Sequence, residues 1–393
     1  MQSRKKHTGR NLVLLNAGIR RDTLFKATVR SSVKLVHFSD YVNKPENFVN
    51  AFTEADGIFF EELKVAVVNF EKEDQIGYLN TYLGRNAVLS TEPERYLYKT
   101  GLKRRKRFND GENASWGIKA VLAENSSFSG KGVRIAILDT GIFKEHADLK
   151  GRKIKTKKFV ESGSAKDVDG HGTHCAGVAC GFKDSNGFRY GVAYESEIFA
   201  GKVLNDQGEG TDGSILAGIE WALSEKCRVI SMSLGAPAGI DESYSETYEN
   251  VAKRAMKSGA LIVAAAGNES NRPSYIAPVG HPANCPSILA VGAIDSNLKI
   301  AWFSCGGVNP VGGQVDIVAP GVSVYSLINV QNEHAKWDGT SMATPYVAGI
   351  AGMFCEQNKN ASPLEVWSLI TQHARRLKLS SIDAGSGLVL APE

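Results

Sequence analysis

Gly339-Thr340-Ser341-Met342-Ala343-Thr344-Pro345 is the stretch from which the rest of this sequence is best interpreted. A serine stands where a loop of small residues turns into a helix, and residues 346–354 carry no charge, which predicts a buried helix. A hydroxyl at a buried helix N-terminus meets free backbone N–H groups and the positive end of the helix dipole. That environment favours the negative charge that develops beside a serine during acyl transfer. Taken alone, the stretch is more typical of tight packing than of chemistry.

Two other segments supply a carboxylate and an imidazole. Residues 133–141 are typical of a short apolar strand that ends in Asp139 and a glycine turn, and residues 169–177 place His171 at the start of a predicted helix. Taken separately, an aspartate at a turn and a histidine in a core are both common. Together with Ser341 they provide the base and the orienting carboxylate that a serine nucleophile needs near neutral pH.

The three segments resemble the active-site signatures of subtilisin-like serine proteases, in the chain order Asp, His, Ser of that family. The resemblance runs from about Trp116 to the C-terminus and implies a catalytic triad of Asp139, His171 and Ser341. A fourth matching segment, residues 264–268, ends in Asn268, to which the resemblance assigns the oxyanion-hole amide. It also implies a three-layer α/β fold with a mostly parallel central sheet.

Composition and periodicity agree with a globular α/β protein. The chain has 393 residues, of which 42% are hydrophobic and 22% charged, and its net charge of +4 is too small to indicate a nucleic-acid partner. No apolar run approaches the ~18 residues that span a membrane. Strand-like and helical segments alternate, which predicts parallel strands joined by crossover helices. The predicted strands are residues 198–204, 229–234, 261–266 and 288–294, and the predicted helices are 213–224 and 245–257, with a capping box at Ser362 and Glu365.

The first hundred residues have a different pattern. They predict a β-α-β-β-α-β order, which is ferredoxin-like and resembles the inhibitory propeptide of many subtilisin-like proteases. Such propeptides place their C-terminal tail in the active-site groove, and here that tail would lie within residues 94–99. We therefore divide the chain into a small α+β propeptide domain (1–98), a basic linker (99–115) and a catalytic domain (116–393). The predicted elements are strands at 33–38, 58–60, 65–70 and 87–90 and helices at 46–54 and 72–83.

The linker contains the basic run Lys103-Arg104-Arg105-Lys106-Arg107. It can be a solvated linker or an exposed processing site. Our hypothesis is that the enzyme cleaves itself between about Tyr98 and Asn113, which makes its own N-terminal domain an intramolecular inhibitor.

The resemblance also outlines a substrate groove. Residues Ser233, Leu234 and Gly235 match the edge strand that pairs with an extended peptide by β-augmentation. The pocket for the residue before the scissile bond would be lined by Leu234 and by three more residues, none of them charged, which predicts a preference for large apolar residues. Asp206 and Glu209 belong either to a solvated loop or to a region that favours basic residues farther upstream. The three further pocket residues are Ala265, Ala266 and Gly280.

No cofactor is predicted for catalysis. His171 and His174 have metal-ligand spacing but no further ligand set, so we predict no catalytic metal. Structural calcium is common in proteins of this resemblance, and residues 184–187 with Asp148 offer oxygen ligands for it. Cys175, one helical turn after His171, is expected to be buried packing.

The start of the chain is basic, but the apolar residues 12–15 are too few for a secretory signal. We therefore predict a cytoplasmic protein, or a secreted one if a leader has been removed. The six cysteines form no CxxC pair and should be reduced in the cytosol.

The predicted function is that of a serine endopeptidase made as a self-inhibited proenzyme, with proteins or peptides as substrates. Two alternatives stay open at this point. One is a maturation protease or transpeptidase dedicated to a single partner. The other is a catalytically silent peptide-binding module, which a serine-directed phosphonate probe would not label.

Overall fold

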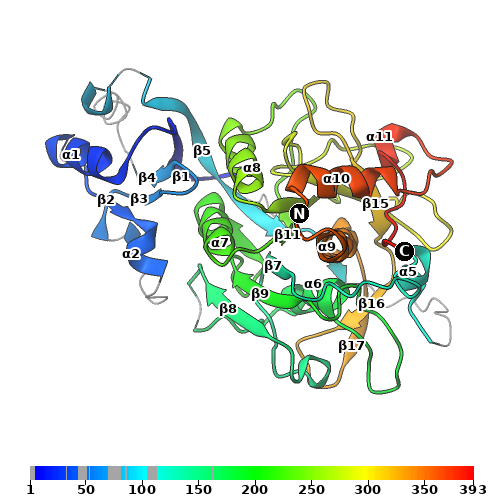
Figure 1. Cartoon of the computed structure of the whole chain (residues 1–393). Coiled ribbons are helices and arrows are strands. Elements are labelled where there is room, and N and C mark those ends of the chain that lie inside the picture. The colour runs from blue at the N-terminus through cyan, green and yellow to red at the C-terminus, as the bar shows by residue number, and fades with distance from the viewer. Residues whose placement is uncertain are drawn as a thin grey trace.

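The structure is a computed structural model that describes residues 5–31, 33–42, 51–52, 54–69, 81–84, 86–103, 113–161 and 163–393. Figure 1 shows a small N-terminal domain, coloured blue, beside a larger α/β domain that contains the rest of the chain. One long strand, β5, runs from the first domain onto the second.

A seven-stranded sheet forms the centre of the larger domain. Its strands are ordered β15-β14-β13-β11-β7-β9-β8, and every neighbouring pair is parallel, which confirms the predicted fold class. Each strand predicted from the alternation of segments is present close to its predicted bounds. The strands are β7 (Arg134–Asp139), β8 (Ile154–Lys158), β9 (Glu197–Lys202), β11 (Val229–Met232), β13 (Leu261–Ala265), β14 (Leu289–Ile294) and β15 (Ile317–Pro320).

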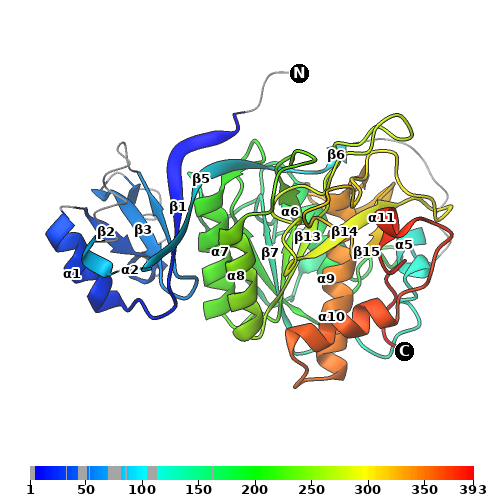
Figure 2. The ribbon, with the colours of Figure 1, turned by 90° about the horizontal axis from the view of Figure 1, so that it is seen from above.

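Helices cover both faces of this sheet and complete the three layers. Figure 2 shows α7 and α8 on the side of the N-terminal domain and α9 on the other side, where α6 packs against it. The predicted capping box is present at the start of α10, where Ser362 and Glu365 each bond the backbone N–H of the other. The helices are α5 (Trp116–Ala120), α6 (His171–Cys180), α7 (Asp212–Ser224), α8 (Glu246–Lys257), α9 (Thr340–Gln357), α10 (Pro363–Gln372) and α11 (Ser381–Ala384).

The N-terminal domain is built on a mixed sheet in the order β5-β1-β4-β3-β2. Along the order β5-β1-β4-β3 each neighbouring pair is antiparallel, which is the ferredoxin-like arrangement, and β2 is an extra edge strand parallel to β3. Its elements are β1 (His7–Leu15), α1 (Arg21–Ser31), β2 (Leu35–His37), α2 (Phe38–Val42), β3 (Gly57–Phe60), β4 (Val65–Val68) and β5 (Val88–Lys99).

Two of the predicted assignments in this domain were wrong. The first strand is His7–Leu15, so the apolar residues 12–15, which we compared with a secretory signal, belong to a buried strand. Residues 33–38, predicted to be that first strand, form only the short edge strand β2 and the start of α2. The predicted helices at 46–54 and 72–83 lie mostly outside the described residues.

The sheet of the N-terminal domain buries both of its faces. Alternate residues of β1 point to opposite sides, as a strand requires. Val13 and Leu15 join a core that belongs to this domain, whereas Leu12 and Leu14 join the core that continues into the catalytic domain. Helices α7 and α8 of the catalytic domain lie against this second face (Figure 2).

The chain reaches the catalytic domain along β5. The second half of β5 pairs with β10 (Glu209–Thr211) and β12 (Leu234–Gly235) of the catalytic domain. Residues Leu102–Lys103 then form β6, which pairs with β17 (His334–Asp338), itself paired with β16 (Val324–Leu327). Most of the basic run lies outside the described residues. Within the described part, no helix combines the length and the apolar character that a membrane crossing requires.

Candidate active site

Asp139 and His171 meet at the edge of the central sheet where its parallel strands end. Asp139 is the last residue of β7, and His171 is the first residue of α6. Nδ1 of His171 lies 2.8 Å from Oδ1 and 3.0 Å from Oδ2 of Asp139, and both side chains are buried. A carboxylate in this place holds the proton on Nδ1 and leaves Nε2 as the proton acceptor.

A buried carboxylate that we did not single out from the sequence, Asp167, fixes this pair in place. It accepts hydrogen bonds from the Thr140 hydroxyl, the Gly170 N–H, and both the N–H and the hydroxyl of Thr173. Burial raises the pKa of Asp167 above its usual value, and these hydrogen bonds offset only part of that rise. Asp167 thus joins the residue after Asp139 to the first turn of α6. The sequence signal that could have identified Asp167 was its position shortly before a predicted helix start.

The imidazole of His171 is held in a strongly polar setting. Burial alone would lower its pKa, but the Asp139 carboxylate and the Cys175 sulfur outweigh burial and raise the pKa well above its usual value of 6.5. Its Nε2 is buried and has no hydrogen-bond partner among the described residues. The ring therefore presents an unused nitrogen on the side away from Asp139.

Cys175 and His174 are both buried in the core beside the site. Burial raises the pKa of the Cys175 thiol, whose sulfur lies 3.9 Å from Nδ1 of His171 and donates to the Ser341 carbonyl. Burial lowers the pKa of His174 to about 3, and its Nε2 bonds the Val324 and Ala335 carbonyls. His174 is therefore a neutral core histidine.

Ser341 is the second residue of α9, in the first turn of an 18-residue buried helix. Its hydroxyl lies 3.0 Å from the Ser233 carbonyl oxygen, to which it donates, and the Ser233 hydroxyl donates to the Ser341 carbonyl at 2.8 Å. The Thr100 hydroxyl, from the segment after β5, lies 2.5 Å from the Ser341 hydroxyl. The chain thus brings its own residue 100 to the serine.

Asn268 presents an unused donor beside this serine. Its Oδ1 accepts from the N–H and the hydroxyl of Thr340, at 2.9 Å each, and these bonds orient the amide. Its Nδ2 is buried and has no hydrogen-bond partner among the described residues. A Cβ on Gly339 would lie 3.2 Å from that Nδ2 and 2.8 Å from the Thr100 carbonyl oxygen, so both atoms face the same small space. Buried donors without acceptors are rare in proteins and call for a functional explanation.

Comparison of the sequence with known proteins identifies the family and several relatives of this chain. Residues 130–388 match the subtilase family. The chain belongs to that family. Subtilisin DY from Bacillus licheniformis is 38% identical over 273 residues, which cover 69% of this chain and 94% of the relative. Alkaline elastase YaB from Bacillus sp. (strain YaB) is 38% identical over 284 residues, 71% of this chain and 70% of the relative. Subtilisin E from Bacillus subtilis (strain 168) is 36% identical over 272 residues, 69% of this chain and 68% of the relative.

This subtilase is a subtilisin-like serine endopeptidase, a hydrolase that acts on peptide bonds. The family match begins at residue 130, so the N-terminal domain lies outside it. These relatives give no support to the cytoplasmic location that we predicted from the start of the chain.

The segment predicted to form the edge of the groove, residues 233–235, contains β12. This strand pairs with β5 of the same chain. Leu234 pairs with Lys99, and Gly235 pairs with Tyr98, in an antiparallel register. On its other side β5 pairs with β10, where Gly210 is opposite Leu97. Ser233 lies between β11 and β12 and bonds Ser341 as described above.

The residues predicted to line the pocket before the scissile bond are also gathered here. Ala265 ends β13, Ala266 follows it, and the Gly280 N–H donates to the Ala266 carbonyl at 2.9 Å. A Cβ on Gly280 would lie 2.6 Å from the Ala236 carbonyl oxygen, so the backbone leaves no room for a side chain there. All of these pocket residues are buried and uncharged.

The acidic residues suggested for calcium do not fit that ion. Asp148 accepts from the Tyr190 hydroxyl and from Nε2 of His334, while Asp184 accepts from two backbone N–H groups and the Tyr325 hydroxyl. Calcium needs six to eight oxygen ligands that are free to face it. Here hydrogen-bond donors face both carboxylates instead.

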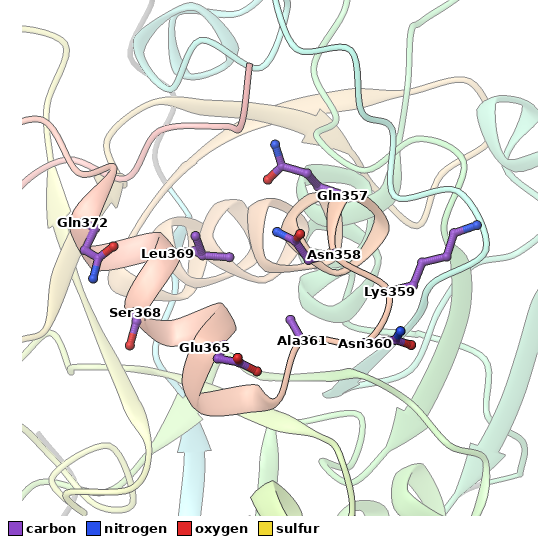
Figure 3. A pocket seen from close by; sticks show the side chains of 9 residues that line it. All are labelled: Gln357, Asn358, Lys359, Asn360, Ala361, Glu365, Ser368, Leu369 and Gln372. Atoms are coloured by element: carbon purple, nitrogen blue, oxygen red, sulfur yellow. The ribbon is translucent and has the colours of Figure 1, made fainter.

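A hollow of about 650 Å³ lies at the opposite end of α9 from Ser341 (Figure 3). It is open and lined by polar residues such as Asn358, Asn360 and Gln372. A helix rises 1.5 Å per residue, so this hollow lies roughly 24 Å from the serine. It takes no part in the active site.

Proposed function

We propose that Ser341 is the nucleophile, His171 the general base and Asp139 the residue that orients it. In each cycle Ser341 Oγ attacks the scissile carbonyl, and its proton passes to Nε2 of His171. The imidazolium then donates that proton to the leaving amine, and water hydrolyses the acyl-enzyme by the reverse path. The Asn268 Nδ2 and the Ser341 N–H bind the oxyanion.

Two features of the geometry support these roles. Among the described residues, neither Nε2 of His171 nor Nδ2 of Asn268 has a hydrogen-bond partner, and both atoms are buried where the reaction needs an acceptor and a donor. The raised pKa of His171 has a consequence for the rate. Only the neutral imidazole can accept the proton, so activity rises with pH through that pKa.

We also propose that this enzyme is made as a self-inhibited proenzyme and cleaves itself between Thr100 and Gly101. The observation that carries this proposal is the position of Thr100, whose carbonyl shares the space beside Gly339 with Nδ2 of Asn268. A Cβ on Gly101 would lie 2.7 Å from Nε2 of His171, so glycine is required there in this position. This bond falls within the interval 98–113 that we predicted from the sequence.

The neutral pocket supports a preference for large apolar residues before the scissile bond. Thr100 is smaller than the residues that this preference favours, so it fills less of the pocket than leucine or phenylalanine would. We therefore expect self-cleavage to be slower than cleavage of a good substrate, and a Thr100→Leu substitution to speed it.

The test is intact mass over time for the full chain beside its Ser341→Ala variant. The expected result is a wild-type product that begins at Gly101, with no shortening of the variant. Shortening of both would mean that another protease acts, and a first cut elsewhere would overturn the proposed site. If neither shortens, a serine-directed phosphonate decides. Labelling of wild type would indicate an active enzyme that keeps its N-terminal domain, and no labelling would favour the silent binding module.

A further inference from the structure

We propose that Asp169 makes this protease selective for a basic residue, above all lysine, at the second position before the scissile bond. The proposal rests on the proposed function, because the chain's own segment is taken as an example of how a substrate binds. With cleavage after Thr100, the residue at that second position is Lys99.

The backbone of Lys99 is held as a substrate backbone would be. Its N–H donates to the Gly208 carbonyl at 3.0 Å, and its Cα is paired with that of Leu234 on the opposite side. Lys99 is thus fixed between two segments of the catalytic domain, and its side chain can reach only a small part of that domain.

At the end of this reach the Lys99 ammonium forms an ion pair and hydrogen bond with Oδ2 of Asp169. The side chain of Asp169 is 10% exposed and that of Lys99 is 22% exposed, so the pair is largely shielded from water. Shielding strengthens the attraction between opposite charges. A substrate with a neutral residue here would lose this ion pair with Asp169.

The site also accommodates the aliphatic part of a lysine. Gly208 has a φ of +80°, and a Cβ there would lie 2.6 to 2.8 Å from Cδ, Cε and Cγ of Lys99. The lysine chain therefore lies directly over a glycine backbone, in space that any other residue at 208 would fill. A short side chain on the substrate would leave this space empty.

Asp169 is positioned by the catalytic machinery itself. Its Oδ1 accepts from the backbone N–H of His171 at 3.2 Å, which leaves Oδ2 directed at the ammonium. A second acidic residue in this region, Asp206, is already paired with the buried Lys202 at 2.8 Å. Its charge is therefore neutralised within the catalytic domain, and the selectivity is assigned to Asp169.

The experiment compares two internally quenched peptides with the self-processed enzyme. Both contain leucine and tyrosine at the fourth and third positions before the cleaved bond and threonine followed by glycine around it. They differ only at the second position, which is lysine in one and glutamine in the other. The expected ratio of kcat/KM, lysine over glutamine, is about tenfold, the size of a shielded ion pair that contributes selectively.

The Asp169→Asn variant should reduce this ratio to about one, since asparagine keeps the size and the Oδ1 acceptor but not the charge. We use the ratio as the readout because a general effect of this substitution on His171 lowers kcat/KM for both peptides equally. Such an effect leaves the ratio unchanged. Glu161→Gln is the matched control, since it removes one exposed negative charge that Lys99 does not contact, and it should keep the wild-type ratio.

A wild-type ratio near one, or a tenfold ratio that persists in Asp169→Asn, would overturn the selectivity and leave the proposed protease intact. A ratio that falls equally in Glu161→Gln would also overturn it, because the effect would then come from overall charge. Failure to cleave either peptide would overturn the proposed function and this inference with it.

Discussion

The two sheets of this molecule are covered in different ways. The parallel sheet of the catalytic domain has α6 and α9 on one face and α7 and α8 on the other, all from the same domain. The sheet of the N-terminal domain packs one face, with Val13 and Leu15, into its own core, but its other face is completed by the catalytic domain. Among the described residues, the catalytic sheet is thus covered by helices of its own domain, whereas the second face of the N-terminal sheet is covered by the other domain.

Polar contacts also join the two domains, and each domain supplies carboxylates that accept hydrogen bonds from the other. Glu220, in α7, accepts hydrogen bonds from the N–H groups of Glu61 and Leu63 in the β3–β4 turn. In return, Glu94 and Glu92 of β5 accept from N–H groups in the first turns of α7 and α8, at Gly213 and Thr247. Carboxylates are favourable at helix N-termini. Substitutions at the catalytic residues should therefore change the chemistry, and substitutions at residues of either domain that join the two should change inhibition.

The largest effect is expected inside the catalytic domain, for Asp139→Asn. Loss of the carboxylate lets the proton sit on the wrong nitrogen of His171, and self-cleavage should slow by about 10⁴-fold. Intact mass over time measures the rate, and thermal unfolding checks that the variant folds as wild type does. A loss of less than about tenfold would contradict the role of Asp139.

The second prediction tests the shared face of the N-terminal sheet. Phe60 lies on β3 against Phe38, which contacts Phe159 of the catalytic domain. Phe60→Ala should raise the inhibition constant of a fragment ending at Thr100 by about 10²-fold, since such truncations cost about 3 kcal/mol or more. Leu89→Ala, on an exposed part of β5, is the matched control and should change the constant less than twofold. Equal inhibition by the Phe60→Ala and wild-type fragments would contradict the proposal that this face of the N-terminal sheet holds the fragment on the catalytic domain.

The third prediction concerns pH and Glu220. Burial beneath the N-terminal turn raises the pKa of Glu220 from its usual 4.5 to about 8. A carboxyl whose pKa is raised by association takes up a proton on binding, so inhibition should be tightest near pH 5 and weaken as pH rises through 8. The weakening is at most about tenfold per pH unit. Glu220→Gln should flatten this dependence, and an unchanged pH profile in that variant would contradict the assignment.

The smallest effect is expected for calcium. Because hydrogen-bond donors face Asp148 and Asp184, the catalytic domain should not rely on calcium there. The midpoint of thermal unfolding should be the same in millimolar calcium and in chelator. If the midpoint depends on calcium and Asp184→Asn abolishes that dependence, this region binds the ion. The stability of the catalytic domain would then depend on calcium, contrary to the prediction.

Much of the catalytic domain was predictable because its signals are local. The apolar strands, the helix between them and the capping box at Ser362 each depend on neighbours in sequence, and all were present. The N-terminal domain was harder because β1 ends in four apolar residues, which are buried on two faces by two different cores. No alternation in polarity marks such a strand, and it was overlooked.

The sequence by itself determined the family, the α/β class and the candidate residues Asp139, His171, Ser341 and Asn268, because these lie in short motifs whose chemistry can be recognised locally. Only the tertiary structure decided which segment pairs with β10 and β12, that Thr100 meets Ser341, and that Asp169 meets Lys99. Those contacts join residues 70 to 241 positions apart. They depend on how two sheets are docked, which no short stretch of sequence specifies.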